Sequence, residues 1–260
     1  MPKFAANLSM LFTELPFLDR IAAAAAAGFD AVECQFPYEY PAGDIARRLE
    51  DSRIGMVLHN LPAGDWGAGD RGIAALPQRR TEFRDGVGRA IEYARALGCP
   101  RLNCLAGIVA PPCHAEAHDV LIDNLRFAAG ALAQAGLELL IEPVNTRDAP
   151  GFFVNRSRQA IAVIDAVGAA NLRLQFDLYH AQVMEGDLAT SLQTLLPRIG
   201  HIQVADNPGR HEPGTGEINY AFLFKHLDTL GYDGWVGCEY RPQTTTLAGL
   251  AWLAEHRAAR

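Results

Sequence analysis

Short apolar runs alternate with longer amphipathic segments along the whole chain. Because a side-chain period near two indicates strands and a period near 3.6 indicates helices, we predict eight of each. The strands are expected at 3–8, 30–34, 54–59, 101–105, 137–142, 172–177, 200–204 and 234–239. The helices are expected at 15–27, 42–52, 78–97, 116–135, 157–167, 187–196, 219–230 and 246–257. Each strand is followed by a helix, which is typical of parallel α/β folds.

The number of strand–helix units predicts the fold. Eight units in 260 residues fit a (β/α)8 TIM barrel, which takes about 250 residues. No linker or low-complexity stretch divides the sequence, so we predict a single domain over residues 1–260. In such barrels the active site lies at the C-terminal ends of the strands.

Four of the apolar runs end in an acid or an amide, at Glu142, Asp177, Gln203 and Glu239. Roughly thirty residues separate consecutive members, which is about one βα unit. An acid at the end of a buried strand is costly unless a cation meets it. All-oxygen ligands favour Mg²⁺ or Mn²⁺, whereas zinc usually attracts histidine or thiolate. The sequence therefore predicts one metal site at the rim of the barrel.

The alternation of side chains along a strand tests this prediction. If the four site residues point inward, the residue next to each of them in the chain faces the helices, as a barrel requires. These neighbours are Ile141, Phe176, Val204 and Cys238. Taken singly, Asp177 is also a candidate cap of the next helix, and Glu142 precedes Pro143 and could belong to a turn. The joint arrangement favours function, because three facing carboxylates repel one another strongly without a cation.

Other polar residues near the rim are candidate substrate contacts. They are Asn7, His59, Asn60, His180 and Arg210. His180 follows Asp177 by three residues and could donate to a substrate oxygen, or it could be satisfied by backbone groups. Arg210, in the loop after the seventh strand, would meet an acidic substrate, with a solvated surface arginine as the alternative.

Composition limits the partners. A net charge of −7 argues against a nucleic-acid surface, which is usually basic. Five cysteines without a CxxC pair favour reduced thiols in a cytosolic protein. The sequence has no signal-peptide pattern. No apolar run approaches the length of about 18 residues that a membrane span needs. We therefore expect a cytoplasmic protein without a nucleic-acid or membrane partner, with homo-oligomer formation left open.

Longer segments carry a resemblance to a known family. They lie at 4–12, 58–66, 141–145, 201–210, 211–220 and 235–240. In these segments the chain resembles the hydroxypyruvate isomerases of the xylose-isomerase-like TIM-barrel superfamily, and the resemblance covers nearly the whole length. It implies metal ligands at Glu142, Asp177, Gln203 and Glu239, with Glu142 and Glu239 as the acid–base pair.

The resemblance also implies an activity, the interconversion of hydroxypyruvate and 2-hydroxy-3-oxopropanoate (tartronate semialdehyde) through an enediolate. The 2-oxo-tetronate isomerases are an alternative, since they share residues 7–9 and 211–213 with this chain. Related ketose isomerases and epimerases are a further alternative, although the 3-epimerases carry histidine where this chain has Gln203. A metal-dependent endonuclease and a non-catalytic acid-binding barrel are less favoured, the former because of the charge and the absence of a histidine-rich cluster for several zinc ions.

Overall fold

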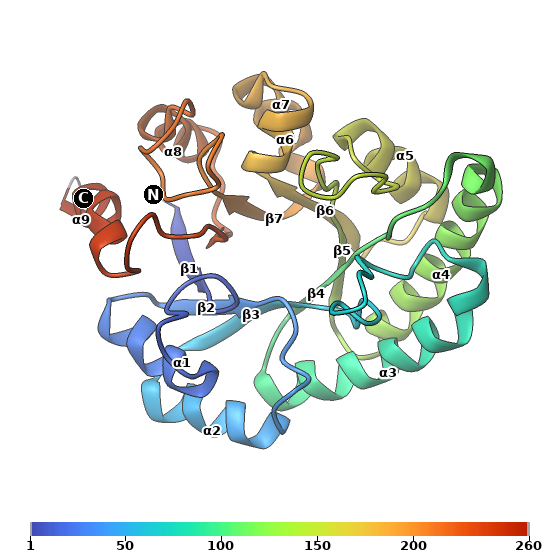
Figure 1. Cartoon of the computed structure of the whole chain (residues 1–260), viewed down its shortest axis with the longest axis horizontal. Coiled ribbons are helices and arrows are strands. Elements are labelled where there is room, and N and C mark those ends of the chain that lie inside the picture. The colour runs from blue at the N-terminus through green and yellow to red at the C-terminus, as the bar shows by residue number, and fades with distance from the viewer. Residues whose placement is uncertain (1, 259–260) are drawn as a thin grey trace.

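A computed structural model of the protein describes residues 2–258, with side chains to residue 254, and shows the predicted barrel (Figure 1). Residues 1, 259 and 260 of the predicted domain lie outside the described part. The strands are β1 (Lys3–Asn7), β2 (Ala31–Cys34), β3 (Gly55–Asn60), β4 (Arg101–Cys104), β5 (Glu138–Ile141), β6 (Leu172–Asp177), β7 (Ile199–Val204) and β8 (Trp235–Cys238). Each strand end lies within one residue of its predicted position.

All neighbouring strands pair in parallel, and the sheet closes on itself. β1 pairs with β2 on one side and with β8 on the other, where Ala5 lies opposite Gly237. β7, which pairs with the other side of β8, also pairs with β6 and places Gln203 opposite Asp177. Closure removes every exposed sheet edge, and it brings the ends of all eight strands to one rim.

The helices surround the strands on the outside (Figure 1). They are α1 (Phe17–Ala26), α2 (Ala42–Ser52), α3 (Arg80–Leu97), α4 (His114–Gln134), α5 (Ser157–Val167), α6 (Leu178–Met184), α7 (Leu188–Leu195), α8 (Tyr220–Thr229) and α9 (Ala251–Ala258). Short 3₁₀ turns lie at η1 (Pro77–Arg79), η2 (Pro111–Cys113), η3 (Leu196–Arg198) and η4 (Ala248–Leu250). Glycine follows several helices, and Gly98 (φ 62°) and Gly168 (φ 70°) take the left-handed conformation after α3 and α5. A residue with a Cβ would be strained there by about 1–2 kcal/mol.

One helix was not predicted. α6 begins directly after Asp177 and has seven residues, so its pattern is too short to show a helical period. The predicted helix 187–196 corresponds to α7. The connection after β6 therefore contains two helices, and the first of them belongs to the rim of the barrel.

Two cores confirm the predicted alternation of side chains. The interior of the barrel contains the buried side chains of Ala5, Ala31, Leu58 and Leu140, with Val57 beside them where the register between β2 and β3 shifts and interrupts the alternation. The layer between strands and helices contains Ile141, Phe176, Val204 and Cys238, all at most 1% exposed. Burying a large apolar side chain contributes about 1.5–3 kcal/mol, so a shift of one residue in any of these strands would cost several such contributions.

Most of the cysteines lie in the interior of the protein. All five cysteines lie in the described part of the chain, and none of them forms a disulfide bond. Four are buried and Cys113 is exposed. No helix among residues 2–258 combines the length and the apolar character that a membrane span requires.

Candidate active site

A cavity of about 450 Å³ opens where the strands end. Most of its lining is polar, with three acids and four arginines among the side chains. The lining residues are Gln35, Asn60, Trp66, Arg71, Leu105, Glu142, Val144, Arg147, Asp148, Ala149, Phe152, Tyr179, His180, Pro208, Gly209, Arg210, Glu239 and Arg241. The cavity therefore lies at the end of the barrel where the site was predicted.

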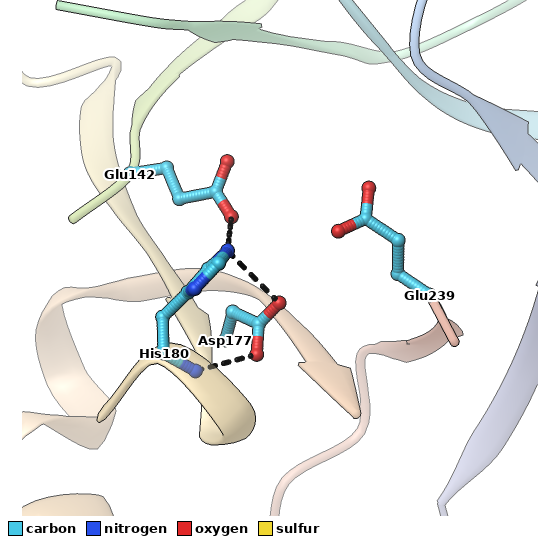
Figure 2. Close-up of side chains that lie close together, drawn as sticks. All are labelled: Glu142, Asp177, His180 and Glu239. Atoms are coloured by element: carbon cyan, nitrogen blue, oxygen red, sulfur yellow. Dashed lines mark hydrogen bonds and ion pairs between the residues drawn. The ribbon is translucent and has the colours of Figure 1, made fainter. Parts of the chain in front are cut away.

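Four buried residues form a cluster at this cavity, and three of them, Glu142, His180 and Glu239, line it. Glu142 follows β5 by one residue, Asp177 ends β6, His180 lies in the first turn of α6, and Glu239 follows β8 by one residue. One potential ligand atom from each lies within 4.8 Å of all the others. Figure 2 shows Glu142 and Glu239 reaching in from opposite sides, with Asp177 and His180 beside Glu142. The cluster could hold a metal ion.

The two oxygens of Asp177 have different surroundings. Oδ1 accepts hydrogen bonds from the backbone N–H groups of Tyr179 (2.7 Å) and His180 (3.2 Å), and thereby caps α6. Among the described residues no hydrogen-bond donor reaches the buried Oδ2. A buried, unpartnered carboxylate oxygen beside two other carboxylates is the donor set that a hard divalent cation requires. Asp177 therefore caps α6, which was one of the two roles that the sequence allowed. Its Oδ2 also fits a metal ligand.

His180 has a defined tautomer. Asn145 Oδ1 accepts from the backbone N–H of Asp148 at 2.7 Å, so its Nδ2 faces His180 Nδ1 at 2.6 Å. The backbone N–H of Asn145 donates to the same Nδ1 at 3.4 Å. Because Nδ1 accepts, the proton of the neutral ring is on Nε2. Nε2 lies 3.9 Å from Glu142 Oε1 and 3.8 Å from Asp177 Oδ2 (Figure 2). His180 therefore fits a hydrogen-bond donor in the cavity better than a metal ligand.

Burial and mutual repulsion disfavour the charged forms of the carboxyl groups. Burial, reinforced by Glu239 and Asp177, raises the pKa of Glu142 well above its ordinary value. Burial raises the pKa of Glu239 to about 7, although Arg210 opposes the shift. Burial also raises the pKa of Asp177, against the effect of Arg210 and of two backbone hydrogen bonds. Without a metal the cluster retains protons that a bound cation would displace.

In the metal-free protein we expect the free energy of unfolding to fall as the pH rises from about 4.3 to about 7. The folded-state pKa of Glu239, about 7, lies above the unfolded value of about 4.3. Between these values the folded state binds a proton that the unfolded chain has lost, so this stabilisation is complete below the lower pKa and disappears above the higher one. Its size is on the order of 3 kcal/mol.

Urea unfolding in the presence of a chelator at about pH 5 and about pH 8 measures this change. The Glu239→Gln variant has no titratable group at this position and should lose less stability between the two pH values. An equal loss in the variant and the wild type would show that Glu239 is not its source.

Arg210 approaches the cluster from the loop after β7. Its Nη2 contacts Glu239 Oε2 at 2.6 Å, its Nη1 lies 3.6 Å from Asp148 Oδ2, and the guanidinium lies over the ring of Tyr179. Its side chain is only 16% exposed, so Arg210 is no solvated loop arginine. Its backbone has φ 54°, a left-handed conformation that is unusual for a residue with a Cβ. The surrounding loop must therefore hold Arg210 in this strained position.

Asp206 holds that loop. Its carboxylate accepts hydrogen bonds from the backbone N–H groups of Asn207, Gly214, Gly216 and Ile218. Its own backbone N–H donates to His211 O at 2.8 Å, and its O accepts from Arg210 N at 2.8 Å. Four donors to one buried carboxylate fix both arms of the loop, so Arg210 projects into the cavity from a rigid base.

Gln203 is near the cluster, but its amide is already engaged. Its Nε2 donates to Glu33 Oε1 at 2.7 Å, and its Oε1 accepts from Gln175 Nε2 at 2.6 Å. Because a carboxylate only accepts, Glu33 determines which end of the Gln203 amide is the nitrogen. The amide oxygen keeps one lone pair for a further partner. Its role as the fourth metal ligand stays a prediction.

Two of the predicted substrate contacts, His59 and Asn7, are not among the described residues that line the cavity. Asn60 lines the cavity, but His59 is not among the lining residues of the described chain. Successive strand residues point to opposite faces, so both could not face the cavity. His59 packs edge-on against Tyr38, and burial lowers its pKa to about 4, so its ring is neutral near pH 7. Asn7 is buried as well and donates to Glu239 Oε1 (3.2 Å) and Glu33 Oε1 (2.9 Å). Asn7 thus contacts a site carboxylate instead of the open cavity.

The sequence interpretation missed several polar partners of the two glutamates. Asn103 Nδ2 donates to Glu142 Oε2 at 2.9 Å, and Gln35 Nε2 donates to Glu239 Oε1 at 3.0 Å. Glu33 lies at the inward position of β2, in the run Ala31–Cys34. An acid inside a buried strand is costly unless it is paired, and this signal could have identified Glu33.

The comparisons with known proteins agree with this geometry. The family model of the xylose isomerase-like TIM barrel matches residues 21–256. A 2-oxo-tetronate isomerase of Cupriavidus necator is 53% identical, covering 97% of this chain and 98% of its own. The hydroxypyruvate isomerase of Escherichia coli is 52% identical, covering 99% of this chain and 100% of its own.

A solved structure resembles the whole chain. It is a crystal structure described as an AP endonuclease of family 2 from Brucella melitensis, 46% identical, with a TM-score of 0.96 over 98% of this chain and 99% of that one. The barrel, the cluster at the ends of its strands and the matches along nearly the full length lead to one assignment. The chain belongs to the xylose isomerase-like TIM barrel family.

Proposed function

We propose that this protein is a hydroxypyruvate isomerase, which interconverts hydroxypyruvate and 2-hydroxy-3-oxopropanoate. The observation that carries the proposal is the pair of buried glutamates, Glu142 and Glu239, which face one cavity from opposite sides (Figure 2). Two such groups within reach of the substrate can move a proton between neighbouring carbons, one by taking it and the other by returning one. The 52% identity to the Escherichia coli enzyme over the whole chain supports the same activity.

The proposed reaction moves one proton between carbons. One glutamate takes a proton from carbon 3 of hydroxypyruvate, and the electron pair forms the carbon–carbon double bond of an enediolate. The other glutamate returns a proton to carbon 2, while the hydroxyl proton passes from the oxygen on carbon 3 to the oxygen on carbon 2. No atom is gained or lost, so the reaction needs no redox cofactor.

Glu142, Asp177 and Glu239 would hold a divalent cation, with Gln203 as the fourth ligand. When bound, Mg²⁺ or Mn²⁺ would supply positive charge that stabilises the enediolate oxygens. The unpartnered Asp177 Oδ2 and the raised pKa values of the carboxyl groups support this assignment.

Two further residues would position the substrate. His180 presents an Nε2–H donor, and burial lowers its pKa well below the ordinary value, so it stays neutral and donates without adding charge. Arg210 is the cation for the substrate carboxylate, and Tyr179 and Asp148 hold its guanidinium. In the metal-free protein Arg210 balances the charge of Glu239, a task that a metal would share.

A specific observation favours a second candidate, the 2-oxo-tetronate isomerase activity. The Cupriavidus necator relative of that name is 53% identical to this chain. The cavity of about 450 Å³ leaves room for a four-carbon acid. Side-by-side assays of the purified protein with hydroxypyruvate and with the four-carbon 2-oxo acid decide between them, and no turnover of hydroxypyruvate would overturn the first proposal.

The endonuclease name of the Brucella melitensis structure does not extend to this chain. Within residues 2–254 the metal-capable cluster contains three carboxylates and one histidine, not a histidine-rich set for several zinc ions. The net charge of −7 is also opposite to that of a surface for DNA phosphates. Incubation with abasic-site DNA is the direct test, and we expect no cleavage.

Arg210→Ala is expected to reduce kcat/KM for hydroxypyruvate by roughly 10- to 150-fold, because a charge-assisted hydrogen bond to a carboxylate contributes about 1.5–3 kcal/mol. Since Arg210 also contacts Glu239, both kcat and KM should change. Arg241→Ala is the matched control, because Arg241 lines the same cavity but is exposed. Unchanged kinetics of Arg210→Ala, or an equal loss in the control, would contradict a specific role for Arg210.

A further inference from the structure

A carboxylate without a place in the proposed reaction lies inside the barrel. Glu33, on β2, is fully buried. Three side-chain N–H groups reach it: His201 Nε2 at 2.7 Å, Gln203 Nε2 at 2.7 Å and Asn7 Nδ2 at 2.9 Å. They come from strands β7 and β1, so Glu33 joins the strands on either side of β8.

The space for Glu33 is provided by Gly237 on β8. A Cβ on residue 237 would overlap both carboxylate oxygens of Glu33. The backbone of Gly237 lacks the left-handed conformation that would by itself call for glycine. Glycine at position 237 therefore leaves room for the carboxylate of Glu33. Gly237 lies two residues before Glu239 and faces the same side of the strand.

Two of the three partners of Glu33, Gln203 and Asn7, lead to the proposed metal site. Gln203 is the fourth proposed ligand, and Glu33 fixes the direction of its amide. Asn7 bridges Glu33 and Glu239, with one amide group donating to both. Glu33 thus orients one amide ligand, Gln203, and through Asn7 one carboxyl ligand, Glu239.

We propose that Glu33 is a positioning residue that sets the affinity of the cluster for its divalent cation by orienting Gln203 and, through Asn7, Glu239. This inference rests on the proposed metal-assisted function. Residues that orient metal ligands contribute roughly 10- to 100-fold to metal affinity.

The test is the dissociation constant of Mn²⁺, measured by isothermal titration calorimetry without substrate. Glu33→Gln keeps the size of the side chain but leaves one acceptor oxygen for three donors, so Kd should rise roughly 10- to 100-fold. Glu138→Gln is the matched control, because Glu138 is on β5 at the other end of the barrel, beside Arg101 and Arg173. Its Kd should equal that of the wild type.

Gly237→Ala is a second variant that perturbs the same contact by steric displacement and retains the acid. It should weaken Mn²⁺ binding in the same direction, and it carries the test if Glu33→Gln does not fold. Wild-type binding of Mn²⁺ with an unchanged Kd in the folded variants would overturn this inference alone. A wild-type protein that binds no Mn²⁺ would overturn the metal-assisted function together with it.

A double-variant comparison separates positioning from general stability. In a Gln203→Ala background, Glu33→Gln should raise Kd by a smaller factor than in the wild type, because one of its two routes to the metal is gone. Equal factors in both backgrounds would show that Glu33 does not act through Gln203 and would overturn the proposal.

Discussion

Glu142→Gln and Glu239→Gln are each expected to lower kcat for hydroxypyruvate by at least about a hundredfold, the lower end for general acid–base catalysis. Glutamine keeps the size of the side chain but can neither take nor return a proton. Both glutamates are buried in the cavity wall at opposite sides of the site (Figure 2). The reaction needs a proton acceptor and a proton donor, so the loss of either should be severe.

Circular dichroism and the Tm of each variant should show that the fold is retained. Glu138→Gln makes the same chemical change away from the cavity and should keep wild-type kcat. If Glu142→Gln or Glu239→Gln turned over hydroxypyruvate at a near wild-type rate, that residue would have no part in the proton transfer.

Removal of divalent metal should be the second large effect. A cation that stabilises the developing negative charge contributes several kcal/mol, so chelation should lower kcat by about a hundredfold or more. Added Mg²⁺ or Mn²⁺ should restore the activity, because the ligand set offers oxygen atoms to a hard cation. Elemental analysis must confirm the removal, since traces of metal would mask the effect. Full turnover by a verified metal-free sample would contradict the proposed role of the metal.

Gln203→His extends this prediction to the choice of metal. Imidazole suits softer cations than an amide oxygen does, so the variant should shift its preference away from Mg²⁺ while the barrel remains folded. The measurement is the activity restored by Mg²⁺ relative to that restored by Mn²⁺. If this ratio were the same in the variant and the wild type, Gln203 would not bind the metal.

The positions of Glu142, Asp177 and Glu239 could be predicted from sequence because each follows an apolar run that ends at the rim. Strand alternation then placed all three inward, and the buried outward neighbours Ile141 and Cys238 confirm it. His59 shows the limit of this reasoning. Its place beside Asn60 suggested the cavity, although the alternation that placed the glutamates also requires adjacent residues to diverge.

The sequence by itself determined the barrel, its eight strands and the rim at which the acids lie, because these follow from side-chain periods and from the order of strands and helices. Only the tertiary structure decided which distant groups meet. Closure of the barrel brings Glu33 of β2 to Gln203 of β7, 170 residues apart, and Arg210 to Glu239. Such contacts depend on the register between strands and on the course of one loop, and neither leaves a periodic signal in the chain.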